Sequence, residues 1–290
     1  MKRTLSERMF EIINLLLLAL LGLVTLYPFL YVLTISLSSP ADIERIGLHI
    51  FPTNPTFEAY EKVLANPKLY TAYVNTIART LLGLACVLLF TTLTAYPLAR
   101  STFPYRSTIM KLFVFSMLFS GGLIPTFMLV KQLGLLNTIW ALVLPGAVSA
   151  FNIFVMRNFF AAVPSEMLES ARIDGAGELN ILIRIVVPLS VPVLAVIGLW
   201  AVVGHWNSWF DAMIYLNDDN KQVLQLFLRR NVIEPGTNLN QEYSLMGSTQ
   251  VTPANLKSAI IMLVSLPILF AYPFIQRFFV KGIMLGSLKG

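Results

Sequence analysis

The side chains of this sequence that could do chemistry in an apolar setting lie around one acid. Asp211 is the only carboxylate at the depth of the long apolar runs, and Trp206, Asn207, Trp209 and Phe210 come just before it. An ionisable group in such a run is by default a functional hypothesis. Aromatic faces suit the apolar faces of sugar rings, and an amide can bond ring hydroxyls. An aromatic belt at a membrane interface explains the same residues, so both interpretations stand.

Two further amides, Asn75 and Asn152, lie in or beside apolar runs. They are candidates, together with the residues around Asp211, for lining a path through the apolar helices. The sequence contains no cluster of side chains of the kind that metal binding or catalysis requires. His49 and His205 are far apart and Cys86 is the single cysteine, so we expect no metal site and no disulfide framework. No paired carboxylates and no nucleophile with a neighbouring base occur, so we expect no enzymatic activity. The phosphate-binding pattern G-x-x-x-x-G-K-[ST] is absent, and ATP must therefore be bound by other chains.

A second candidate site is the polar stretch ESARIDGAGELNILIRIVVP, residues 169–188, which lies between long runs without charge. Residues 165–173 favour a short helix, and glycine at position 175 favours its end, because glycine takes a left-handed cap most easily. A second helix is expected to begin near Ala176, with one side formed by Leu179, Leu182 and Val186. The stretch therefore predicts two short helices with a bend at Gly175.

The first of these helices is too short to be stable alone in water, so we expect it to dock against another surface. Glu169 and Arg172 can pair with each other or with a partner. The residues small enough to let that surface approach the backbone closely are Ser170, Ala171, Gly175, Ala176 and Gly177. A loop that merely packs beneath its own helices has the same composition, and both alternatives remain open at this point.

The elements that must position these residues are membrane-spanning helices. The chain is 56% hydrophobic and only 12% charged, against about 25% charged for a soluble domain. Six runs of 19 residues or more contain no charge, and a bilayer core of about 30 Å needs roughly 20 helical residues. We therefore predict an all-α membrane protein that forms one domain over residues 1–290. Its six spans are expected at about 12–37, 74–98, 112–130, 138–158, 188–212 and 258–278.

The first run is better interpreted as a retained span than as a secretory signal. Signal peptides have apolar cores of about 7–15 residues and a small-residue cleavage site. This run extends over residues 12–41, and no Ala-x-Ala pattern follows it.

The distribution of basic residues predicts the orientation of the spans. Twelve Lys and Arg residues lie on the side that holds both termini, and eight lie on the other side. The positive-inside rule therefore places both termini, the segment 164–188 and the tail 279–290 in the cytoplasm. It places the loop 217–257 on the outer face. The basic net charge of +6 is explained by this topology, and nothing in the sequence indicates binding to nucleic acid.

Residues 169–188 resemble the EAA signature of the membrane subunits of ATP-binding-cassette (ABC) importers. That signature is Glu-Ala-Ala, three residues, Gly, nine residues, Ile, two to three residues and Pro. Glu169, Ser170 and Ala171 fill its first positions, and Ser170 for alanine is the one departure. The later positions are Gly175, Ile185 and Pro188. The likeness covers nearly the whole chain and is closest to carbohydrate permeases of the maltose-permease type, in blocks 121–145, 206–218 and 276–290.

This resemblance implies a type I ABC importer permease fold and a bacterial cytoplasmic (inner) membrane location. The implied partners are a second homologous permease, two ATPase subunits that bind ATP and Mg, and an extracytoplasmic solute-binding protein. The polar stretch would be the coupling helix that sits in a cleft of an ATPase. Its implied contact residues are Glu169, Ser170, Ala171, Asp174, Gly175, Ala176 and Pro188. The tail would add ATPase contacts at Lys281, Gly282 and Lys289, unless it rests on anionic lipid.

The resemblance further implies a carbohydrate substrate, with an oligosaccharide of the uronic-acid type, as in alginate or pectin, preferred over a neutral one. The path candidates are Asn75, Asn152, Trp206, Asn207 and Asp211. Two alternatives remain. An ion-coupled secondary carrier would need buried titratable groups and usually an internal repeat, and no repeat is found. A membrane assembly subunit without transport activity would also have a docking segment.

Overall fold

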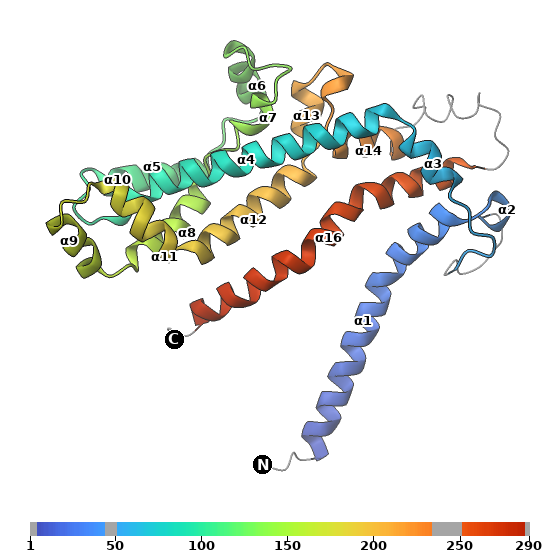
Figure 1. Cartoon of the computed structure of the whole chain (residues 1–290), viewed down its shortest axis with the longest axis horizontal. Helices are drawn as coiled ribbons and strands as arrows, with labels where there is room; N and C mark the ends of the chain where they lie inside the picture. The colour runs from blue at the N-terminus through green and yellow to red at the C-terminus, as the bar shows by residue number, and fades with distance from the viewer. Residues whose placement is uncertain (1–4, 44–50, 234–250, 288–290) are drawn as a thin grey trace. The chain divides into compact units, whose positions relative to one another are not determined.

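The chain is all-helical over the residues that this computed structural model describes, which are 5–43, 51–233 and 251–287, with side chains placed for residues 6–43, 51–233 and 251–270. Extended pairing in this part is limited to one isolated bridge between Ser38 and Pro55. The longest helices are α1 (Leu5–Leu37), α4 (Pro67–Ala99) and α16 (Pro253–Ser287). Figure 1 shows the shorter helices that follow α4 in the chain.

The shorter elements alternate with breaks of a few residues. They are α2 (Pro40–Ile43), α3 (Glu58–Leu64), α5 (Arg106–Leu118), α6 (Leu123–Gln132), α7 (Trp140–Val143), α8 (Ala150–Ala161), α9 (Ser165–Ile173), α10 (Glu178–Ile181), the π-helix η1 (Leu182–Val186), α11 (Val187–Leu189), α12 (Val191–Asn207), α13 (Phe210–Tyr215), the 3₁₀-helix η2 (Asp219–Lys221) and α14 (Leu224–Val232).

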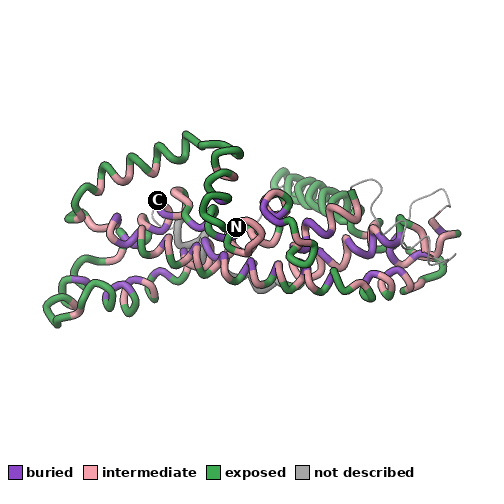
Figure 2. Tube along the Cα trace, turned by 90° about the horizontal axis from the view of Figure 1, so that it is seen from above, coloured by how far each residue is buried: buried purple, intermediate pink, exposed green. Residues whose placement is uncertain are grey.

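The chain divides into two compact units, the first formed by Met1–Leu69 and Leu228–Pro267. In this unit Asn255 joins α16 to the end of α1, because its Nδ2 donates to the carbonyl oxygens of Ile35 and Ser38 at 2.7 Å each. Nearly all of α1 before these residues is exposed although it is strongly apolar. Figure 2 shows helical stretches that are exposed along their length beside others that alternate between buried and exposed residues. Such surfaces are stable only against lipid or another chain.

The second unit is formed by Tyr70–Phe227 and Ile268–Gly290, and α4 supplies the centre of its core. Ala95 and Leu98 of α4 pack with Ile153 and Phe160 of α8 and with Ile197 of α12, all at most 2% exposed. Figure 1 shows α4 running beside α12, and Leu84 Cδ1 would lie 3.2 Å from a Cβ at Gly198. Glycine is therefore what lets these two helices approach closely at that level.

Three helices are long and apolar enough to cross a membrane alone, namely Ser6–Leu37, Pro67–Ala99 and Pro253–Phe270. The count rises to five if each of two bent helix pairs forms one span. Six spans therefore stay a prediction.

Three of the expected spans are not single helices. Residues 112–130 form the end of α5 and most of α6, which are bent by 115° around an extended Phe119 and around Gly122 at φ +85°. Residues 138–158 form α7 and most of α8, separated by a segment that holds Pro145 and Gly146. Counting charges misses such breaks, because glycine, serine and proline interrupt helices without carrying charge.

The expected span 188–212 also contains breaks. The helices Glu178–Leu189 and Val191–Asn207 meet at 83°, and α12 then ends where Ser208 takes an extended conformation. The second of these breaks places the residues before Asp211 at the end of one helix and the start of the next.

Candidate functional site

The polar stretch forms the two short helices that the sequence predicts, α9 and α10, with the bend at Gly175. Gly175 has φ +81°. Its N–H donates to the carbonyl of Arg172 at 3.0 Å, and the N–H of Ala176 donates to the carbonyl of Ala171 at 2.9 Å. This pair of bonds with a left-handed glycine is the Schellman termination of a helix. We call residues 165–188 the α9–α10 hairpin.

The outer surface of the hairpin is open. Glu169, Ser170, Asp174 and Gly175 are exposed, while Leu168 is 2% exposed and anchors α9 to the core. A Cβ at position 175 would have no atom within 4 Å. The bend contributes to a pocket of about 270 Å³ that Asp174, Gly175, Ala176, Asn180, Ile181, Arg184 and Ile185 line. The hairpin therefore offers a small-residue surface with acidic groups and an unfilled hollow.

One detail of the predicted second helix is wrong. Leu182 and Val186 are buried as expected, but Leu179 is 62% exposed and Ile181 takes its place in the core. The chain from Leu182 to Val186 is a π-helix, whose wider turn changes which side chains share a face. The prediction from the α-helical period that Leu179 shares one side with Leu182 and Val186 is therefore wrong for Leu179.

Glu178 joins the hairpin to α4. Its Oε1 accepts from Nε of Arg172 at 2.8 Å, and its Oε2 accepts from the hydroxyl of Tyr96. The hydrogen bond from Arg172 and then that from Tyr96 lower the pKa of Glu178. The Tyr96 ring lies edge-on to Phe160 at 6.5 Å, and the guanidinium of Arg100 lies 4.7 Å from its centroid. Arg172 therefore pairs with Glu178, whereas the sequence analysis named only Glu169 or a partner protein as its possible partners. The sequence does show an acid six residues after this arginine, across the bend at Gly175.

Asp211 is 25% exposed and forms an ion pair with a buried arginine. Arg79 on α4 is 2% exposed and donates from Nη2 to Oδ2 of Asp211 and from Nη1 to the carbonyl of Ser208 at 3.1 Å. The other carboxylate oxygen accepts from the Ser208 hydroxyl at 2.7 Å and from the N–H of Ala212 at 2.9 Å. Asp211 therefore fixes the break between α12 and α13 to α4.

The aromatic candidates lie on both sides of that break. Trp206 is half-buried at the end of α12, and its indole N–H has no hydrogen-bond partner within the described part of the chain. Asn207 donates from Nδ2 to the carbonyl of Val203 at 2.9 Å. Trp209 and Phe210 form an edge-to-face pair with centroids 5.5 Å apart. An aromatic pair in this geometry packs favourably, so these rings are ordered by each other and by the break.

Asn75 lies in a separate polar site, which we call the amide pocket. Its volume is about 310 Å³, and its polar lining is formed by Asn75, Asn137, Thr138 and Lys221. Asn75 donates from Nδ2 to the carbonyls of Asn220 and Gln222 at 2.8 and 3.0 Å. Nζ of Lys221 donates to the carbonyl of Asn137 at 2.9 Å.

The sequence analysis missed the partners of Asn75 in this pocket. Asn137 has φ +59°, and its Oδ1 accepts from the N–H groups of Asn217 and Asp218 at 3.3 Å each. Asparagine tolerates a left-handed conformation better than most residues. The nearby Gly134 and Asn137 were therefore the sequence signal for a turn at this position.

The described contacts of Asn152 lie outside these sites, and the tail candidates lie largely outside the described residues. Asn152 is half-buried in the first turn of α8, where its N–H faces Oγ of Ser149 at 3.5 Å. The side chain of Lys281 and all of Lys289 lie outside the described residues, and Gly282 is known only as part of the α16 backbone. The loop 217–257 is described except for residues 234–250. Among the described residues, no three His, Cys, Asp or Glu side chains are grouped as a metal site would require.

Comparison with known proteins gives consistent matches. Residues 97–285 match the family described as "Binding-protein-dependent transport system inner membrane component". The chain is 41% identical over its whole length to Protein LplC of Bacillus subtilis (strain 168), of which it covers 98%. It is 38% identical to the polygalacturonan/rhamnogalacturonan transport system permease protein YtcP of the same organism, over 98% of this chain and 100% of that protein.

A solved structure agrees with these matches. It is a crystal structure of a bacterial ABC transporter involved in the import of the acidic polysaccharide alginate. One of its chains matches with a TM-score of 0.91 and 33% identity, over 96% of this chain and 99% of that one.

Proposed function

From two premises we propose how this chain engages its partners and its substrate. The chain belongs to the family of binding-protein-dependent transport system inner membrane components, and it is a permease subunit of an ABC importer for sugars. It is a multi-pass transport subunit and not an enzyme. In our proposal it forms half of a translocation path with a second permease. Two ATPase subunits hydrolyse ATP with Mg, and a solute-binding protein delivers the sugar from outside.

The single observation that carries the coupling proposal is the open α9–α10 hairpin tied to α4 through Glu178. The exposed small residues on its outer surface let an ATPase cleft approach the backbone closely. The proposed contacts remain Glu169, Ser170, Ala171, Asp174, Gly175 and Ala176, with Pro188 at the return into the membrane. Residues of the tail 279–290 form a second proposed contact.

A displacement of the hairpin would be transmitted along α4. This helix has 33 residues, which corresponds to about 50 Å at 1.5 Å per residue. Tyr96 near one end bonds Glu178, and Arg79 and Asn75 nearer the other end bond the α12–α13 break and the amide pocket. ATPase closure must shift the balance of inward and outward states by about 5.5 kcal/mol to reverse it from 1:99 to 99:1.

We place both termini and the hairpin in the cytoplasm of a bacterial inner membrane, with six spans. The excess of basic residues on that side supports this orientation. The amide pocket then lies toward the outer face. Its residue Lys221 belongs to the loop 217–257, which we propose as the contact for the solute-binding protein.

We propose an oligosaccharide with acidic sugar units as the substrate. Two relatives, by their printed names, transport or import uronic-acid polymers, namely polygalacturonan and alginate. Lys221 in the amide pocket supplies a cation next to amide groups, which is a lining that suits a carboxylated sugar. The solute-binding protein that copurifies with the chain should bind oligogalacturonate more tightly than a neutral malto-oligosaccharide. Tighter binding of the neutral sugar would contradict the substrate class.

The coupling proposal is tested by crosslinking. A cysteine placed at Ser170, with Cys86 replaced by alanine, should crosslink to an ATPase subunit in native membranes. Ser170→Leu should reduce the amount of ATPase that copurifies while the chain stays in the membrane, because it adds bulk where the partner approaches. Gly175→Leu should do the same, but it also strains the left-handed cap at φ +81°, so Ser170→Leu is the cleaner test. Thr102→Leu, in an exposed turn outside the hairpin, is the matched control.

A Ser170 cysteine that captures only residues of this same chain would instead identify the hairpin as a loop packed on its own helices. The contact between this permease and its ATPase would then have to be sought in another segment.

A further inference from the structure

A groove along α5 combines uncompensated positive charge with an apolar wall. It has a volume of about 490 Å³ and is lined by Arg106, Ser107, Met110, Lys111 and Val114. This volume lies within the range of about 300–1,000 Å³ that is usual for ligand sites. The groove belongs to neither the hairpin nor the amide pocket.

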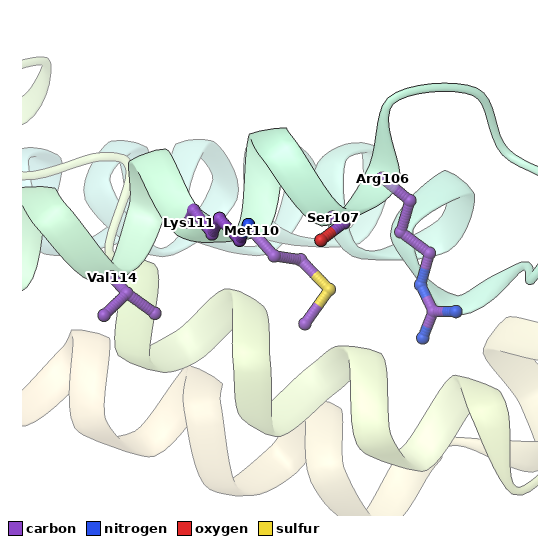
Figure 3. Close-up of a pocket in the computed structure, with 5 residues that line it drawn as sticks. All are labelled: Arg106, Ser107, Met110, Lys111 and Val114. Carbon is purple, nitrogen blue, oxygen red and sulfur yellow. The ribbon is translucent and has the colours of Figure 1, made fainter.

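The lining residues divide by position along the helix. Arg106 and Ser107 lie in the first turn of α5, Met110 and Lys111 are neighbours one turn further on, and Val114 ends the groove with an apolar side chain. Figure 3 shows Arg106, Met110 and Val114 pointing to the same side of α5, as residues four apart on a helix do.

The two cations have no acidic partner in the described part of the chain. Nε of Arg106 donates to the carbonyl of Leu98 at 3.0 Å, a contact that fixes the side chain without neutralising its charge. Lys111 is exposed, and neither residue takes part in an ion pair. Two unneutralised cations beside a hydroxyl form a set of donors for an anion such as a phosphate.

The place of the groove in the sequence indicates which anion fits. Lys111 is the last charged residue before the charge-free run 112–130, so the groove straddles the change from polar to apolar surroundings. Met110 is half-buried against the core of the second unit, but Val114 is 47% exposed, and a soluble anion would leave it facing water. A phospholipid offers a phosphate at one end and acyl chains at the other, and basic pockets at the cytoplasmic boundary of spanning helices bind acidic headgroups.

We propose that the α5 groove binds one anionic phospholipid, with its phosphate between Arg106 and Lys111 and its acyl chain along Met110 and Val114. The inference uses the membrane location of the chain and is independent of the direction of transport and of the sugar. The experiment measures bound lipid and not transport. The lipid proposal can therefore fail while the import proposal holds, and the import proposal can fail while the lipid proposal holds.

The test is native mass spectrometry of the full chain, purified with its partner subunits in mild detergent. Added phosphatidylglycerol should bind in preference to phosphatidylcholine. Lys111→Gln should lower the fraction with bound phosphatidylglycerol by about fivefold, which corresponds to the loss of one basic residue near an acidic lipid. Among the described residues Lys111 is exposed and takes part in no hydrogen bond or ion pair, so this variant removes the charge without removing a tie between helices. Arg106→Gln should also weaken binding but removes the bond to Leu98.

Lys131→Gln is the matched control, because Lys131 is an exposed cation at the end of α6, and it should leave lipid binding unchanged. Equal binding of the two lipids, or unchanged binding in Lys111→Gln, would overturn the proposal. Displacement of phosphatidylglycerol by inorganic phosphate as readily as by more lipid would point to a soluble anion instead. A photo-crosslinker at Ser107 that captures a partner protein rather than lipid would show that the groove is a subunit contact.

Discussion

At the scale of single residues, the polar groups of this permease act mainly as ties between helices. Arg79 and Asp211 hold α4 to the α12–α13 break, and Tyr96 and Glu178 hold α4 to the hairpin. Asp211 was singled out as an isolated charge on the substrate path, and the structure gives it a cationic partner. Its place next to Trp206 and Asn207 keeps it near the proposed path while its charge is compensated.

The Arg79–Asp211 pair leads to a prediction about stability. Removing one partner leaves a buried charge uncompensated, which typically costs 3–5 kcal/mol, whereas replacing both by apolar residues costs much less. Asp211→Leu alone should therefore lower the thermal midpoint of the detergent-purified chain strongly, and the double variant Arg79→Leu/Asp211→Leu should recover most of that loss. The midpoint is measured by fluorescence-detected size exclusion after heating. A double variant as unstable as the sum of the two single variants would contradict this interpretation.

The Tyr96–Glu178 contact leads to a prediction about coupling. Tyr96→Phe removes only the hydroxyl, so the ring packing on Phe160 is retained. We expect normal amounts of assembled complex but less sugar transported per ATP hydrolysed, because the hairpin loses its bond to α4. The measurement is the ratio of uptake to ATP hydrolysis in proteoliposomes. Tyr105→Phe is the control, since that tyrosine is 81% exposed. An unchanged ratio in Tyr96→Phe would argue against transmission through α4.

At the scale of elements, uncharged breaks decide where the helices end. The bend of 115° between α5 and α6 depends on Gly122, whose φ of +85° and ψ of 177° are nearly restricted to glycine. Its neighbour Gly121 has no such conformation. Neither position is crowded, since a Cβ at Gly122 would meet nothing within 4 Å and one at Gly121 would lie 3.9 Å from Pro125.

This pair of glycines gives a matched experiment. Gly122→Ala should destabilise the chain by about 1–3 kcal/mol through backbone strain alone, and Gly121→Ala should have little effect. Thermal midpoints in the same detergent measure the difference. Equal midpoints for the two variants would mean that the bend can change without loss of stability.

At the scale of the whole molecule, the exposed apolar surface requires other partners. Most of α1 and large parts of α5 and α6 are uncovered, and lipid and further subunits are the surroundings that can cover them. Mass spectrometry of the chain purified in mild detergent should identify a second permease and a phosphate-loop ATPase. Purification of the chain alone, even after crosslinking at Ser170, would contradict the proposed partners and the contact at the hairpin.

The sequence by itself determined the all-helical membrane class, the family and the hairpin with its bend at Gly175. These depend on local signals, namely long apolar runs and a glycine in a left-handed cap. Only the tertiary structure decided that Asp211 pairs with Arg79, that Glu178 bonds Tyr96, and that Asn75 shares a pocket with Asn137 and Lys221. Each of these contacts joins residues more than 60 positions apart, and their partners are fixed by how helices pack and where they break. No local pattern of charge or hydrophobicity carries that information.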